Sequence, residues 1–257
     1  MPFTLAHPAA VLPLRGVSRL RMAPLIIGAM VPDLPYYLPG RIGRYLPLTH
    51  ALAHSLTIDL LLGYALLASL LLLQRPLTAL LSSRARALCL RALTPFRQPA
   101  EWAVAAPAIV FGVWTHLLWD SFTHRDGFMV RRVAALSAPL ILGPYDGTLY
   151  HALQYLSSVI GLCLLALWYG RLTAPAPDTG AGASRSPAGP VLLLVLVAAL
   201  LIGGVQGVKD FGEAHSVYRA LDVLLTRGVT WFAVLYLTAG IVLTLEHGAG
   251  QLPGARD

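Results

Sequence analysis

Residues 102–119 read WAVAAPAIVFGVWTHLLW, and this uncharged run decides the class of fold. A helix needs about 20 mainly apolar residues to cross the hydrocarbon core of a bilayer. Two shorter apolar stretches, 3–14 and 22–32, flank a basic link and would form a helical hairpin. Four other stretches are long and as apolar as 102–119, namely 55–74, 147–170, 186–208 and 228–245. The sequence therefore predicts an all-α, polytopic integral membrane helical bundle, with about five full spans and a short N-terminal helical hairpin.

The composition of the 257-residue chain excludes a soluble enzyme and a disordered protein. Hydrophobic residues make up 56% of the chain and charged residues 12%, whereas a soluble domain carries about 25% charged residues. The net charge of +7 comes from arginines and one lysine in short loops between apolar stretches. Membrane proteins use basic loops to fix their orientation, so we expect no nucleic-acid partner. The first arginines follow an apolar stretch, the reverse of a secretory signal, so we expect no signal peptide.

The distribution of arginine predicts the orientation in the membrane. Loop 75–100 carries five arginines and no acidic residue. Because loops rich in Lys and Arg stay on the cytoplasmic side, we expect this loop in the cytoplasm and the protein in a cytoplasmic membrane. Residues 171–190 are rich in Ala, Pro, Gly and Ser, which predicts a flexible linker. It would separate a membrane domain over 1–170, which holds most of the polar residues, from a C-terminal transmembrane helix pair over 191–257.

Histidine and aspartate residues gather at one face of the predicted bilayer. They fall at helix ends opposite the Arg-rich loop, whereas random placement would scatter them over both faces. The residues on this face are His7, Asp33, His50, His54, His116, Asp120, His124 and His151. His247 falls on the cytoplasmic side, and His215 falls in a distant outer loop. Polar side chains at membrane depth are costly and tend to mark function.

The spacing within this group indicates a metal site. His116 and Asp120 are four residues apart, as are His50 and His54, so the side chains of each pair would project from one helix face. Imidazole nitrogens and carboxylate oxygens suit Zn²⁺ or another divalent transition metal. One such residue alone could be a helix cap or a satisfied polar group, but the coincidence of five favours a metal. The five are His7, Asp33, His54, His116 and Asp120, with Asp33 or Asp120 as a candidate base.

Longer motifs around these residues carry a resemblance to a known family. They read MPFTLAHPAAVLPL (1–14), IIGAMVPDLPYYL (26–38), AHSLTIDL (53–60), THLLWDSFTHRDG (115–127) and LQYLSSVIGL (153–162). Over about residues 1–165 the chain resembles an uncharacterised bacterial membrane family, the domain of unknown function 4184. That family is similar to the predicted membrane-bound metal-dependent hydrolases and distantly to zinc-dependent phospholipase C.

The resemblance implies particular roles for these residues. Its shared pattern is an N-terminal His, a PD motif, an HS pair and an H-x-x-x-D helix. It carries metal-ligand roles to the five residues named above, and Ser55 follows His54 as in the HS pair. The hydrolases often have a second carboxylate or His just after the PD motif, where this chain has Leu34-Pro35-Tyr36. A multi-metal site therefore does not follow from the resemblance.

These observations favour a membrane-embedded, zinc-dependent hydrolase. A site at the outer bilayer surface, between apolar helices, makes a lipid or a lipid-linked ester or phosphoester the expected substrate, and Arg125 with Arg131 and Arg132 could engage an anionic head group. Asp59, a turn deeper than His54, either faces the site or hydrogen-bonds a neighbouring helix. The residues expected around the ligands or near the substrate are His50, Ser55, Asp59, His124, Arg125 and His151.

Two other classes of protein remain as alternatives. The same group of residues could be a structural polar network in a membrane scaffold or partner-binding protein, in which each interhelical hydrogen bond contributes about 1 kcal/mol. A transporter is disfavoured, because the stretches 147–170 and 186–208 are nearly empty of polar residues that could line a path. The sequence leaves open whether the protein is an enzyme, and it leaves protein partners unknown.

Overall fold

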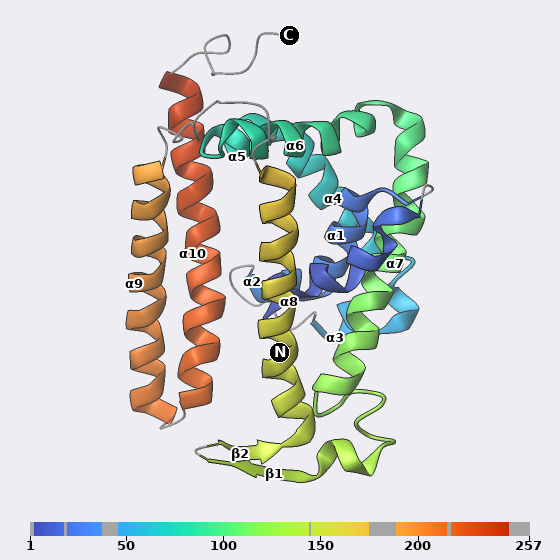
Figure 1. Cartoon of the computed structure of the whole chain (residues 1–257), viewed down its shortest axis with the longest axis vertical. Helices are drawn as coiled ribbons and strands as arrows, with labels where there is room; N and C mark the ends of the chain where they lie inside the picture. The colour runs from blue at the N-terminus through green and yellow to red at the C-terminus, as the bar shows by residue number, and fades with distance from the viewer. Residues whose placement is uncertain are drawn as a thin grey trace. The chain divides into compact units, whose positions relative to one another are not determined.

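The computed structural model describes residues 3–17, 20–37, 46–143, 145–174, 189–214 and 217–246. The chain divides into two compact units, and Figure 1 labels the helices and strands along it. The first unit consists of Met1–Pro35, Arg41–Leu67 and Gln98–Leu172, and the second of Tyr36–Gly40, Ala68–Arg97 and Thr173–Asp257. The predicted domain limits stay predictions, since residues 175–188 of the predicted linker lie outside the described residues, as do His215 and His247.

The first unit begins with the predicted helical hairpin. Its first arm is a 3₁₀ helix, η1 (Thr4–Gly16), which contains two prolines. Proline lacks the backbone N–H that a regular α-helix needs in its interior. The second arm, α1 (Met22–Met30), packs against η1 and continues into the 3₁₀ turn η2 (Val31–Asp33). Short turns follow, namely α2 (Leu34–Tyr37), α3 (Leu46–Thr49) and η4 (Leu52–His54).

The long helix α7 (Pro99–Thr123) packs closely against α1. A Cβ atom on Gly28 of α1 would collide with the backbone of Ile109, and one on Gly112 of α7 would collide with the backbone of Leu25. Small residues at a helix crossing let two backbones approach closely inside a membrane. The crossing brings the end of α1 beside the C-terminal half of α7.

The segment 55–74, predicted as a full span, forms a shorter helix. It is α4 (Ile58–Leu72), with 15 residues, which is about 22 Å at 1.5 Å per residue against a bilayer core of about 30 Å. Pro76 gives the reason for the early end, because a proline ring clashes with the carbonyl four residues earlier, here that of Leu72. The chain continues as a separate helix, α5 (Gln74–Ala79).

After α7 the chain folds back on itself. The N–H groups of Met129 and Val130 donate to the carbonyl oxygen of Ser121 at 3.1 and 3.2 Å. The chain then passes through η6 (Ala134–Ser137) into an antiparallel hairpin of β1 (Pro139–Leu142) and β2 (Tyr145–Thr148). The helix α8 (Leu149–Thr173) follows, and Ser157 on it accepts a 3.1 Å hydrogen bond from Nε1 of Trp119.

The second unit contains α5, α6 (Ser83–Leu93), η5 (Thr94–Arg97) and two long helices, α9 (Gly189–Ala214) and α10 (Val217–Glu246). The long helices pack closely at Gly203, where a Cβ atom would lie 2.8 Å from the carbonyl oxygen of Leu224. The hydroxyl of Tyr236 in α10 donates to the carbonyl oxygen of Leu77 in α5 at 2.8 Å.

The structure confirms the predicted all-α membrane fold. Within the described residues, the β1–β2 hairpin is the sole exception to helical structure among the regular elements. Four helices of this part are long and apolar enough to cross a membrane, namely Pro99–Thr123, Leu149–Thr173, Gly189–Lys209 and Val223–Glu246. Because α4 falls short of that length, this is one fewer than the five spans predicted.

Candidate metal centre

The last turns of α7 bury two side chains that could bind a metal inside the first unit. His116 is 0% exposed and Asp120 is 7% exposed. The two residues are four positions apart on one helix, so their side chains share a face. Nε2 of His116 lies 3.2 Å from Oδ2 of Asp120. The spacing noted in the sequence therefore brings a nitrogen and an oxygen ligand together.

Asp33 reaches the same place from η2, at the end of the α1 arm. It is buried, and its Oδ1 lies 3.7 Å from Nε2 of His116. Its other oxygen, Oδ2, accepts a 2.6 Å hydrogen bond from the hydroxyl of Thr4. Burial alone would raise the pKa of Asp33, but the charge on His116 and the nearby imidazole of His50 outweigh it and hold the pKa below its ordinary value. Asp33 is therefore an ionised carboxylate.

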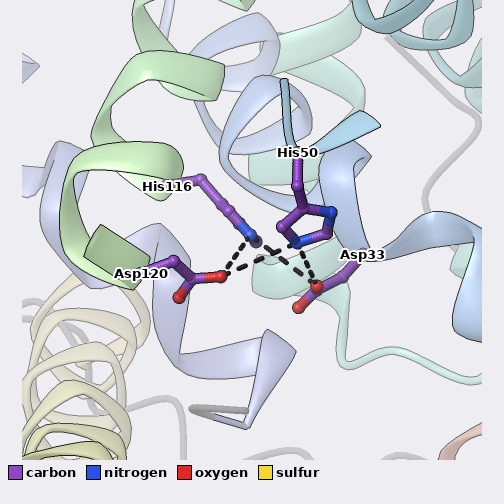
Figure 2. A group of neighbouring side chains, drawn as sticks. All are labelled: Asp33, His50, His116 and Asp120. Atoms are coloured by element: carbon purple, nitrogen blue, oxygen red, sulfur yellow. Dashed lines mark ion pairs between the residues drawn. The ribbon is translucent and has the colours of Figure 1, made fainter. Parts of the chain in front are cut away.

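His50, which follows α3, completes a group of four residues. Its Nε2 lies 3.4 Å from Oδ1 of Asp33 and 3.7 Å from Oδ2 of Asp120. Figure 2 shows the four side chains converging, with His116 and Asp120 on the same helix and Asp33 and His50 on other segments. One ligand atom from each lies within 4.8 Å of the others. This four-residue group consists of Asp33, His50, His116 and Asp120.

Neighbouring groups orient both imidazoles. Nδ1 of His116 lies 2.8 Å from the carbonyl oxygen of Ala29, to which it donates when it carries the proton. Nδ1 of His50 lies 3.4 Å from the hydroxyl of Thr49, which itself donates to the carbonyl oxygen of Pro32 at 2.8 Å. Metal-binding histidines are commonly held through the second ring nitrogen in this way. The contacts leave Nε2 of each ring directed at the carboxylates.

The spacing of the ligand atoms fits a bound cation. Ligands of a tetrahedral zinc ion at 2.0–2.1 Å lie about 3.4 Å apart, and the four nitrogen–oxygen pairs above lie 3.2–3.7 Å apart. Despite this proximity, Nε2 of His116 and Oδ1 of Asp33 make no hydrogen bond within the described residues. Buried polar atoms are rarely left without a partner, and a divalent cation would be a partner for both. The residues therefore fit a metal ion, and their chemistry leaves its identity open.

His7 lies beside the four-residue group. Its ring stacks on His116 with the centroids 3.7 Å apart, and its Nε2 lies 3.5 Å from Oδ1 of Asp120. Burial, together with the charge of His116, lowers the pKa of His7 to about 3. The ring is therefore neutral at pH 7, which is the state in which imidazole binds metals.

His54, the remaining predicted ligand, is not a member of the four-residue group and contacts a main-chain carbonyl oxygen. Its Nδ1 lies 3.1 Å from the carbonyl oxygen of Leu48, and the four-residue group contains His50 instead. The i, i+4 prediction assumes a continuous helix through both residues. The chain instead turns at His50 and is extended at Ala51 before the 3₁₀ helix η4 begins. The neighbouring Ser55 is buried and accepts a 3.0 Å hydrogen bond from Nε1 of Trp114, which ties the start of α4 to α7.

Asp59 is a buried carboxylate that faces α7. It is 0% exposed, and neither oxygen has a hydrogen-bond partner within the described residues. One turn further along α4, a Cβ atom on Gly63 would press on the side chain of Ile109 in α7. Burial raises the pKa of Asp59 to about 7, although the charges of His50 and His116 oppose the shift. Of the two alternatives left open by the sequence, this placement favours the one in which Asp59 faces the site.

The other predicted residues surround the group more loosely. Nδ1 of His124, the residue after α7, lies 3.4 Å from Oδ1 of Asp120. Arg125 lines the adjoining cavity. His151, in the first turn of α8, has its ring 4.9 Å from that of Tyr155, centroid to centroid.

A cavity of about 800 Å³ adjoins the four-residue group. His50 and Asp120 form part of its wall, so the candidate ligands are reached from it. The remainder of the wall combines apolar side chains, among them Leu52, Trp114, Leu117 and Phe128, with the basic Arg125 and Arg131 and the acidic Asp126. A second cavity of about 670 Å³ between η1, α7 and α8 is lined almost entirely by apolar groups.

Together these features define an α-helical membrane protein with a buried group of Asp and His residues that could hold a metal ion. Residues 1–245 match the domain of unknown function DUF4184, and the chain belongs to this family. The match extends beyond the part that carries the sequence motifs. No curated protein and no solved structure matches the chain.

Proposed function

We propose that this protein is a membrane-embedded, metal-dependent hydrolase that acts on a lipid or a lipid-linked ester. The observation that carries the proposal is that two members of the four-residue group, His50 and Asp120, also form the wall of the 800 Å³ cavity. An ester bound in that cavity would lie directly beside the metal position. A purely structural polar network would not need such access.

Two imidazole nitrogens and two carboxylate oxygens would hold zinc or another divalent metal. When bound, such an ion polarises an ester oxygen and lowers the pKa of water. Asp33 and Asp120, the candidate bases, both belong to this ligand set. We assign both the role of holding the cation. Thr4 fixes the second oxygen of Asp33 by a hydrogen bond of 2.6 Å.

The wall of the cavity favours an amphipathic, anionic substrate, because beside the candidate ligand Asp120 it carries two arginines against one further acidic residue, Asp126. Leu117 and Phe128 offer apolar surface to an acyl or prenyl chain. Arg125 and Arg131 offer guanidinium groups, which pair well with phosphate oxygens. A lipid phosphoester combines both properties, so it is the substrate class that we propose.

The charge distribution supports a site on the outer face. Arg21, at the tip of the N-terminal hairpin, donates two hydrogen bonds of 2.8 and 3.1 Å to Glu101, in the first turn of α7. The Arg-rich segment 75–97 also leads into that end of α7. Basic segments favour the cytoplasm, and His116 and Asp120 lie toward the opposite end of α7. A cytoplasmic start of α7 would therefore place the metal position at the outer face.

The test is metal analysis and hydrolysis by the protein purified in detergent. We expect stoichiometric zinc, together with hydrolysis of a phospholipid phosphodiester in mixed micelles that a chelator abolishes and added zinc restores. His116→Ala should lose both properties, and Thr230→Val in α10 should keep both. Absence of bound metal, or hydrolysis that survives chelation, would overturn the proposal. If the group is only a structural network, His116→Ala would lower thermal stability equally with and without chelator.

A further inference from the structure

The carboxylate of Asp120 faces histidines on both sides. Its Oδ2 belongs to the four-residue group, whereas its Oδ1 lies 3.5 Å from Nε2 of His7 and 3.4 Å from Nδ1 of His124. Both distances match the spacing of about 3.4 Å between two ligands of one tetrahedral zinc ion. His7 comes from η1 and His124 from the residue after α7, so the fold brings these ligands together from distant parts of the chain.

His7 has unmet bonding capacity at this point. Its residue is 3% exposed, and neither ring nitrogen has a hydrogen-bond partner within the described residues. Oδ1 of Asp120 likewise has none in this part of the chain. A neutral imidazole normally donates at one nitrogen and accepts at the other. A cation between Nε2 of His7 and Oδ1 of Asp120 would give both atoms a partner.

His124 connects the space beside Oδ1 of Asp120 with the 800 Å³ cavity. Its side chain is 30% exposed and lines the 800 Å³ cavity. Its Nδ1 also lies 3.3 Å from the main-chain oxygen of Asp120, a long contact that a cation would replace or share. A ligand from the cavity could therefore reach an ion bound here.

We infer that a second divalent cation binds between Nε2 of His7, Nδ1 of His124 and Oδ1 of Asp120, so that Asp120 bridges two ions. The inference deepens the proposed function and rests on it for the first ion. The first position has four protein donors, whereas the second has three. Catalytic zinc sites characteristically have three protein ligands and one open position. The ions of two-metal hydrolytic sites lie about 3.5–4 Å apart, a separation that a bridging carboxylate can span.

The surrounding charges are compatible with two ions. The ligand sets of the two ions contain two carboxylates, those of Asp33 and Asp120, and both residues are buried. Two carboxylates against two divalent cations leave a net positive charge. An anionic ester would reduce that charge, in agreement with the basic side chains of Arg125 and Arg131 at the cavity wall.

The test is a titration of metal-free protein in detergent with Co²⁺ or Zn²⁺, read by metal content and the Co²⁺ absorption spectrum. Wild-type protein should bind two ions per chain. His124→Ala should bind one, and it should keep the first because His124 lies outside the four-residue group. His54→Ala, a histidine change at a similar depth, should still bind two. With Mn²⁺ as the probe, wild-type protein should show an exchange-coupled electron paramagnetic resonance signal that His124→Ala lacks.

The outcomes separate this inference from the proposed function. If wild-type protein binds one ion and still hydrolyses the lipid ester, the second cation is wrong and the hydrolase stands. If it binds two ions and hydrolyses nothing, the second cation stands and the hydrolase fails. Two ions retained in both His124→Ala and His7→Ala would also overturn the inference. Should His7→Ala fail to fold, the partly exposed His124 still provides the decisive variant.

Discussion

The helix pair α1–α7 of the first unit and the pair α9–α10 of the second share a packing device but differ in what they enclose. In each, a glycine lets two backbones meet, Gly112 in the first unit and Gly203 in the second. All buried His and Asp residues among the described side chains belong to the first unit. In α10, by contrast, the hydroxyls of Thr230 and Thr244 donate to carbonyls of their own helix. Both helix pairs therefore pack closely, but only the α1–α7 crossing has buried ionisable side chains beside it. Those side chains make the first unit the place of the candidate site.

The largest effect should come from removing a ligand at this crossing. His116→Ala deletes a nitrogen that lies within 3.7 Å of both Asp33 and Asp120. We expect zinc affinity to fall by more than about 100-fold, since even residues that only orient a ligand contribute 10–100-fold. Equilibrium dialysis with ⁶⁵Zn measures this. Thr230→Val, which removes a polar group in α10, is the control and should leave zinc affinity unchanged. An equal fall in zinc affinity in Thr230→Val would contradict the distinction between the two helix pairs.

Substituting alanine for the two glycines tests separately how helix packing affects stability and how it affects the placement of the zinc ligands. A methyl group at Gly112 would collide with the backbone of α1, and one at Gly203 would lie 2.8 Å from the carbonyl oxygen of Leu224. We expect Gly112→Ala and Gly203→Ala each to destabilise the protein by about 1–3 kcal/mol, measured by thermal unfolding in detergent.

Only Gly112→Ala should also weaken zinc binding, because it displaces the carbonyl of Ala29 that lies 2.8 Å from Nδ1 of His116. Weaker zinc binding in Gly203→Ala would contradict this separation. If Gly112→Ala clearly lowers thermal stability but leaves zinc affinity unchanged, the helix crossing does not fix the orientation of the His116 imidazole.

A smaller effect is expected from a residue that orients a ligand. The hydroxyl of Thr4 donates to Oδ2 of Asp33 at 2.6 Å. Thr4→Val keeps the shape and removes this hydrogen bond, so zinc affinity should fall about 10-fold, at the lower end for such contacts. Thr244→Val, which removes a 2.7 Å hydrogen bond to the carbonyl of Gly240 within α10, is the matched control and should have no effect on zinc.

The sequence predicted those parts of the site that depend on one continuous helix. His116 and Asp120 share a face of α7 because the helix runs unbroken through both. The apolar stretches likewise predicted the four long helices, because hydrophobicity and length are local properties. Asp33 was also among the predicted ligands, because the PD motif lies at the end of the short α1 arm.

The remainder depends on turns and contacts that spacing does not encode. The sequence predicted His54 as a ligand and His50 as a residue around the ligands, but the chain between them turns, and the four-residue group contains His50. The end of α4 at Leu72 follows from Pro76, whose effect extends back four residues into an apolar run that itself shows no break. Oδ1 of Asp120 facing both His7 and His124 is a tertiary feature, visible once η1 is packed on α7.

The smallest predicted effect concerns the anionic substrate and separates recognition from metal binding. Arg125 lines the cavity without belonging to the four-residue group, so Arg125→Ala should leave zinc content unchanged. Partly solvated charges contribute modestly to binding, so we expect KM for an anionic phospholipid to rise only about three- to tenfold, with kcat and turnover of a neutral ester nearly constant. Raising the salt concentration should reduce this difference in KM, because salt screens the attraction between the arginine and the anionic substrate.

Arg84→Ala, which changes an exposed arginine of the second unit, is the control. If Arg125→Ala instead lowers kcat equally for anionic and neutral substrates, the cavity binds its substrate through contacts other than charge, and the lipid phosphoester assignment fails while the metal position is unaffected.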